Sequence, residues 1–161
     1  MTTKNDYTLE EWKLLYAAAP MVGLAVASAS PNGPFGVLKE MFAVGMSIAD
    51  AIHKQTTNAL INALVSDIQQ RNTKMERPQS IRTPEEAKQA AINHMRQVAD
   101  LLGRKSTPEE AEGFKRWLMD IAKRVAEASN EGGFFGFGGQ RVSESEQAML
   151  KSLGESLAVK I

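Results

Sequence analysis

The sequence contains no cysteine, which excludes disulfide bonds, thiolate metal sites and thiol redox chemistry. It contains only two histidines, His53 and His94, and neither has a second histidine at the spacing of a helical metal-ligand pair. It also lacks net charge, because 19 basic and 19 acidic residues cancel. No overall electrostatic field therefore favours nucleic acid or an acidic membrane surface as a partner.

The sequence has no apolar run long enough to be read as a membrane span. No charged residue occurs between Leu14 and Leu38, but the apolar part ends at Ala27. Crossing a hydrocarbon core of about 30 Å takes roughly 20 apolar residues. We therefore predict a buried helix of a soluble domain and no transmembrane segment. The polar start of the chain, Met1 to Asp6, has no apolar signal region, so we expect a cytoplasmic protein.

No segment alternates apolar and polar residues as a half-buried strand would, whereas apolar stripes of helical period recur. One such stripe contains Phe114, Leu118, Ile121 and Val125. The fold class predicted is all-α, a single domain over residues 1–161 with six to seven helices. Helices are predicted at about 9–30 (bent or broken at Pro20), 36–53, 57–71, 84–103, 108–130 and 144–158.

Four of these helices begin with the same local chemistry, a capping box. In this motif a hydroxyl accepts from the backbone N–H three residues on, and the glutamate there accepts from the cap's own N–H. The four pairs are Thr8 with Glu11, Thr83 with Glu86, Thr107 with Glu110, and Ser143 with Glu146.

A short phrase occurs twice, at Val26–Gly36 and at Val125–Gly136. The two copies share Val, Ala, Ala, Ser, Gly and Phe in register, and each leads from a helix of small residues into a Gly/Phe turn. This predicts two pseudo-symmetric helix–loop–helix repeats, with halves at about 9–71 and 84–158.

Acidic residues near the two turns form one candidate site, for a divalent metal ion. Glu40, Glu131, Glu144 and Glu146 would converge if the two repeats pack face to face, and hard cations prefer carboxylate oxygens. Their spacing does not follow the calcium-loop pattern. The alternative for Glu144 and Glu146 is a plain role at the start of a helix.

The second turn is the other candidate site, because it sets three phenylalanines, Phe134, Phe135 and Phe137, on a glycine-rich frame. They either fold back to fill the bundle or form a partner-binding patch. The loop lacks the preceding strand and the following Lys-Ser/Thr of a phosphate-binding loop. No nucleophile elbow or other catalytic set is present either. We therefore expect a protein that is not an enzyme; a small hydrolase or transferase is the third hypothesis.

The repeated phrase, with the acidic helix start Val142-Ser143-Glu144-Ser145-Glu146, resembles the TerB-like tellurite-resistance family. The matching stretches are Val22–Glu40 and Ile121–Leu157, a little over a third of the chain. The resemblance implies a cytoplasmic, all-helical domain of two pseudo-repeats that acts in stress responses as an interaction or sensing module. It also implies metal ions at acidic turn positions and a protein partner, in some members a membrane protein. The turn aspartate of the family is replaced here by Pro31-Asn32 and Asn130-Glu131.

The function predicted is thus a non-catalytic stress-response interaction module, and the alternative is a domain that binds or senses divalent metal ions. Without thiols, the chain would aid tellurite resistance by binding partners or ions rather than by redox chemistry. A homodimer is compatible with its Ala/Gly-rich helix faces but is not required by them.

Overall fold

The computed structural model describes residues 2–30, 44, 47–48, 50–51, 54, 56–70, 81–130 and 142–159. Within these residues every regular element is helical, and no strand occurs. A 3₁₀ turn, η1 (Lys4–Asp6), precedes α1 (Leu9–Ala29), α3 (Ala59–Gln70), α4 (Pro84–Lys105), α5 (Pro108–Asn130) and α6 (Glu144–Ser156). The prediction of an all-α domain is confirmed, with five α-helices in the described residues. The described residues of the predicted helix 36–53 include five helical positions: 44, 47, 48, 50 and 51.

The predicted helix starts are confirmed. The hydroxyls of Thr8, Thr83, Thr107 and Ser143 each accept the backbone N–H of the glutamate three residues on, at 3.1–3.2 Å. Each glutamate in turn accepts the N–H of its cap residue. These bonds satisfy backbone donors that have no partner within the helix, so the glutamates are engaged in starting helices.

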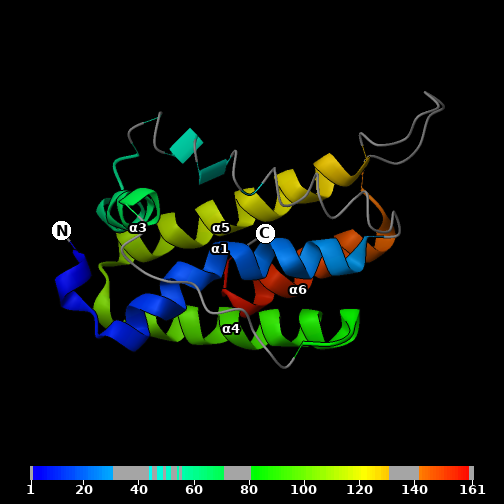
Figure 1. Ribbon diagram of the computed structural model, residues 1–161, viewed down its shortest axis with the longest axis horizontal. Helices are drawn as coiled ribbons and strands as arrows, with labels where there is room; N and C mark the ends of the chain where they lie inside the picture. Colours follow the sequence, from blue (N-terminus) through cyan, green and yellow to red (C-terminus); the bar gives the residue numbers. More distant parts are fainter. Residues whose placement is uncertain are drawn as a thin grey trace.

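Helix α1 is the central element of the bundle. It packs most extensively against α4, then against α5 and α6. Figure 1 shows α1 and α5 running in the same direction along the long axis, with α4 and α6 running in the opposite direction. Leu15, Val22 and Val26 of α1 are fully buried. The core therefore lies along α1, between the other three long helices.

The helix continues through Pro20 as one element. Proline has no N–H to donate to the carbonyl of Tyr16, but the surrounding helices hold α1 in place on several sides. By length and composition alone α1 is apolar enough to cross a membrane, so the sequence argument that the apolar run is too short is wrong; 61% of the most apolar window of α1 is buried inside the bundle. The absence of a membrane span stays a prediction from the sequence.

At two glycines, one in α1 and one in α5, a side chain from another part of the chain approaches the helix closely. A Cβ at Gly23 would lie 2.6 Å from Cγ2 of Val44, so glycine lets the Val44 side chain approach α1. A Cβ at Gly113 would lie 2.6 Å from Nδ2 of Asn58, which donates to the carbonyl of Glu110 at 2.9 Å. That bond ties the start of α3 to the start of α5.

A buried polar cluster holds η1, α1 and α3 together at the end of the bundle where α1 begins (Figure 1). Asp67 of α3 is only 5% exposed; its Oδ1 contacts Nζ of Lys4 at 2.6 Å, and its Oδ2 accepts from Nε1 of Trp12 at 3.1 Å. The Lys4 ammonium also lies 5.8 Å from the centre of the Trp12 ring. Because each buried polar atom in these contacts has a partner, the cluster can be buried without a large desolvation cost.

The internal repeat is not settled by these residues, because the turns at 31–36 and 131–136 lie outside them. The helices that lead into the two turns, α1 and α5, end at the same end of the bundle, and α6 begins there (Figure 1). The pseudo-symmetry and the total of six to seven helices remain predictions.

Candidate functional site

The structure describes two of the four predicted acidic metal ligands, and it places them differently. Glu144 is exposed at the first turn of α6, whereas Glu146 is fully buried. Oε2 of Glu146 accepts from N of Ser143 at 2.9 Å and from Oγ of Ser143 at 2.8 Å. The helix-start role proposed for Glu146 is therefore observed, and the two carboxylates face different surroundings.

Glu40 and Glu131 lie outside the described residues, as do Phe134, Phe135 and Phe137 of the predicted partner patch. Across the described residues, no group of three or more His, Asp or Glu side chains is placed to hold a metal ion. The metal site and the phenylalanine patch thus remain predictions from the sequence.

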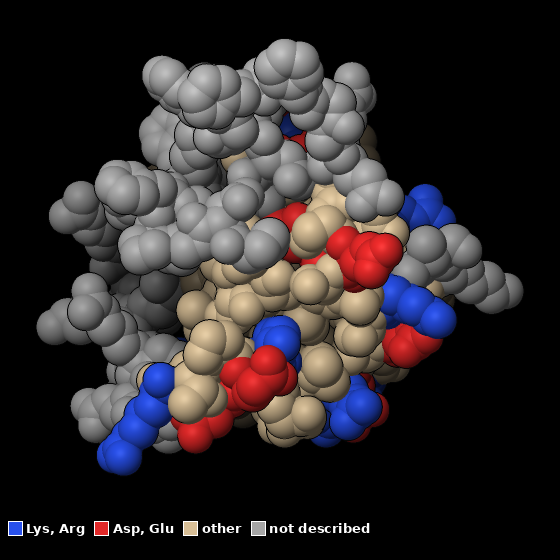
Figure 2. Space-filling view, turned by 90° about the vertical axis from the view of Figure 1, so that its right-hand side faces the viewer, with Lys and Arg blue, Asp and Glu red and all other residues tan. Residues whose placement is uncertain are grey.

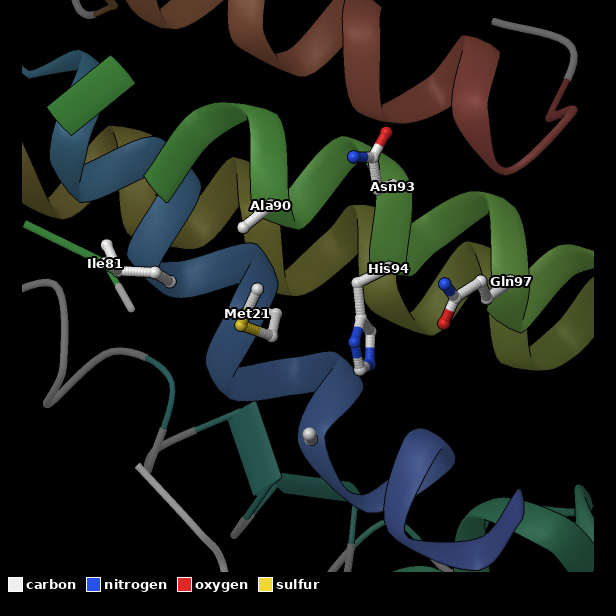
Figure 3. A pocket seen from close by; sticks show the side chains of 7 residues that line it. Met21, Ile81, Ala90, Asn93, His94 and Gln97 are labelled. Atoms are coloured by element: carbon white, nitrogen blue, oxygen red, sulfur yellow. The ribbon is translucent and has the colours of Figure 1, made fainter. Parts of the chain in front are cut away.

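A different feature, the His94 hollow, lies between α1 and α4. Figure 3 shows the His94 ring extending from α4 toward α1, with Met21 of α1 beside it. The hollow has a volume of about 250 Å³ and is lined by Ala17, Met21, Ile81, Ala90, Asn93, His94 and Gln97. Its floor is apolar, and the amides of Asn93 and Gln97 are exposed on α4.

The hydrogen bond of His94 determines which form of its ring is present. Nε2 lies 2.8 Å from the carbonyl oxygen of Leu14, which can only accept, so Nε2 carries the proton. Burial lowers the pKa of His94 below its usual 6.5, and the hydrogen bond to Leu14 opposes this in part. The ring is therefore neutral at pH 7, and Nδ1 is left as a hydrogen-bond acceptor.

The hollow can recognise apolar groups and hydrogen-bonding groups without presenting a formal charge. With His94 neutral, none of its seven lining residues is charged at pH 7. Sequence reasoning treated His94 as an isolated residue. The sequence does contain a pattern that points to the hollow. Four of its lining residues share one face of α4 at helical spacing: Ala90, Asn93, His94 and Gln97. This face lies beside the buried stripe of Ala91, Met95 and Val98.

The charged surface at the end of the bundle where α1 and α5 finish is mixed. On the described part of this face, acidic and basic side chains alternate around residues of other types (Figure 2). Neither sign forms a continuous field there, in keeping with the balanced composition.

Comparison with protein-family models, with curated proteins and with solved structures finds no match to this chain. No family is shown. The TerB-like resemblance therefore rests on the motif residues alone, and every functional statement that follows from it is a proposal.

Proposed function

We propose that this protein is a non-catalytic interaction module that binds a protein partner through the His94 hollow. The stress-response setting is proposed from the sequence resemblance to the TerB-like tellurite-resistance family. The same resemblance makes a membrane protein the first partner to consider.

The observation that carries the proposal is the lining of the hollow. Met21 and Ile81 supply apolar surface, while Asn93, Gln97 and the neutral His94 supply donors and acceptors. A partner's apolar side chain would fit the floor, and its backbone amides would bond to the two carboxamides at the rim. This combination of an apolar centre with a polar rim is typical of protein-recognition surfaces.

A second observation supports binding over catalysis. The glutamates beside the four helix-start hydroxyls accept backbone N–H groups, so their geometry serves the helix ends. A general acid or base must instead lie within hydrogen-bond reach of a substrate proton.

The test compares the partner binding of two variants. One introduces a negative charge into the hollow, and the other changes the net charge by the same amount elsewhere on α4. Ala90→Glu places a carboxylate in the lining, whereas Arg96→Gln removes one positive charge from an exposed position outside it. Tagged wild-type and variant proteins would be recovered from cells grown with and without tellurite, and their bound proteins quantified. We expect Ala90→Glu to lose a partner that wild type and Arg96→Gln retain.

Circular dichroism and thermal unfolding would show that Ala90→Glu is folded. Equal partner recovery by a folded Ala90→Glu variant would contradict binding at the hollow. A triple change of Phe134, Phe135 and Phe137 to serine, tested in parallel, separates the hollow from the sequence-predicted patch. Loss of the partner only in that triple variant would assign the interaction to the phenylalanines instead.

A further inference from the structure

The two ring nitrogens of His94 have different surroundings. Nε2 donates to the carbonyl of Leu14, whereas Nδ1 has no hydrogen-bond partner within the part of the chain that the structure describes. Solvent reaches Nδ1, because the unpartnered side-chain atoms that are shielded from solvent among the described residues are Oγ of Ser47 and Nε1 of Trp117. The neutral ring therefore presents an accessible acceptor.

This acceptor points into the His94 hollow. The two nitrogens of an imidazole point away from each other, and Nε2 is directed to Leu14, which lies nearer the start of α1 than Met21 does. Nδ1 therefore faces the side of the ring on which Met21 and Ala90 lie in Figure 3. The hollow has a volume of about 250 Å³, enough for a side chain and the peptide group next to it. An occupant thus meets an apolar floor with an unpaired acceptor beside it.

Within the described part of the chain, no charged group faces the ring. Only burial and the hydrogen bond to Leu14 shift the pKa of His94. The nearest charged residue along α1, Lys13, is paired with Glu10, and the nearest along α4, Arg96, is exposed outside the lining. The other lining residues are not ionisable: Ala17, Met21, Ile81, Ala90, Asn93 and Gln97. Uptake of a proton at Nδ1 is therefore the event that changes the charge of the hollow.

A backbone N–H beside an apolar side chain is the donor that matches this acceptor. Beyond the first turn of a helix each N–H already donates to the carbonyl four residues back, so a helical segment has none free for Nδ1. An extended segment that is not paired in a sheet keeps its N–H groups free while its side chains point to either face. The hollow therefore fits an extended segment better than a helix.

Building on the proposed function, we propose that the partner binds through an extended segment, with an apolar side chain in the hollow and a backbone N–H that donates to Nδ1 of His94. A proton on Nδ1 replaces this acceptor with a donor and sets a positive charge against the N–H of the partner. The partner is bound when the ring is neutral and released when the ring is protonated. The carboxamides of Asn93 and Gln97 do not titrate, so they contribute no dependence on pH.

The state of the ring is measured first, in the full-length protein without a partner. ¹⁵N NMR of the imidazole nitrogens gives the pKa of His94 and shows which nitrogen carries the proton in the neutral ring. The signals are assigned by their loss in His94→Gln. We expect the proton on Nε2 and none on Nδ1. A neutral ring with its proton on Nδ1 would overturn the inference and leave the proposed function in place.

Binding is measured next, with the protein that wild type recovers from cells and Ala90→Glu loses. The purified partner is titrated by calorimetry from pH 7.5 to below the measured pKa of His94. We expect its affinity for wild type to fall about tenfold or more across that pKa, the loss expected for one hydrogen bond. His94→Gln keeps the donor to Leu14 but has no acceptor at the Nδ1 position. It should bind about tenfold more weakly at pH 7.5 and show no such fall, which also controls for groups of the partner that titrate.

His94→Asn is the reciprocal variant, because its amide oxygen lies at the Nδ1 position and does not titrate. It should bind more tightly than His94→Gln and without the fall, and thermal unfolding checks that each variant is folded. Equal affinity of wild type and His94→Gln at pH 7.5, or a helical binding segment in the chemical shifts of the partner, overturns the inference but not the proposed function. If Ala90→Glu loses no protein, the proposed function fails and the inference fails with it.

Discussion

The neutral imidazole of His94 links the stability of the protein to pH. Its pKa is lowered by burial, so as the pH falls through about 6.5 the unfolded chain takes up a proton before the folded protein does. The stabilisation is therefore complete above pH 6.5 and is lost as the pH falls toward the lowered value. Four carboxyl groups also have lowered pKa values: those of Asp6, Glu11, Asp50 and Glu110. Their contributions to stability are lost only as the pH falls below their usual pKa values of 3.8 for Asp and 4.5 for Glu.

We predict that His94→Gln loses less stability than wild type between pH 7 and pH 5. The glutamine can still donate to the Leu14 carbonyl but does not titrate. Urea unfolding at a series of pH values measures the difference. A His94→Gln variant with the pH dependence of wild type would show that His94 is not held neutral by burial.

The close approach at Gly23 gives a second prediction for a single residue. Gly23→Ala forces its new methyl group against the branched side chain of Val44, and we expect a loss of about 1–3 kcal/mol of unfolding free energy. Gly103→Ala is the control, because a Cβ there meets nothing within 4 Å. Removing a helical glycine should raise stability by up to about 1 kcal/mol. Thermal unfolding of both variants measures the contrast, and a Gly23→Ala protein as stable as Gly103→Ala would contradict the packing.

At the scale of elements, Asp67 connects three segments: η1 through Lys4, α1 through Trp12, and its own helix α3. We predict that Asp67→Ala lowers the free energy of unfolding by about 1–3 kcal/mol, because it leaves the Trp12 N–H buried without an acceptor. Lys4 is 42% exposed and adds little to this loss, since solvent screens its charge.

Asp67→Asn is the comparison for that variant, since its amide oxygen still accepts from Trp12. Urea unfolding should show a clearly smaller loss for Asp67→Asn than for Asp67→Ala. Equal losses would mean that the ionic contact with Lys4, rather than the hydrogen bond to Trp12, holds the cluster together.

The helices and their starts could be predicted from the sequence because both depend on local chemistry. A hydroxyl three residues before a glutamate fixes a helix start regardless of the rest of the fold, and Ser143 with Glu146 is one such pair. The His94 hollow depends instead on which helix faces lie against each other. His94 meets Leu14, and Arg124 meets Asp50, across distances in sequence that no local pattern encodes.

The candidate acidic site stays a prediction from the sequence, because only Glu144 and Glu146 of its four residues lie in the part of the chain that the structure describes. From the sequence alone, a helix-start role and a metal-ligand role for Glu146 cannot be told apart, because both use a carboxylate at the first turn of a helix. Its burial against Ser143 became visible only with the tertiary packing.

At the scale of the whole molecule, α1 is the element on which both the fold and the proposed function depend. It is the most apolar helix of the described residues and also forms one wall of the His94 hollow. A helix of this kind is either the core of a soluble bundle or a membrane segment, and the two have different consequences. Only in the bundle do α1 and α4 meet to form the hollow that we propose as the partner site.

Hydrogen–deuterium exchange along α1 in detergent-free buffer tests this central claim most directly. A helix that is buried among α4, α5 and α6 opens only when the whole bundle unfolds. We predict that the amides from Leu15 to Val26, apart from Pro20, which has none, are among the slowest to exchange, at the rate of global unfolding. Fast exchange over this stretch, or a chain that stays dissolved only in detergent or lipid, would contradict the account.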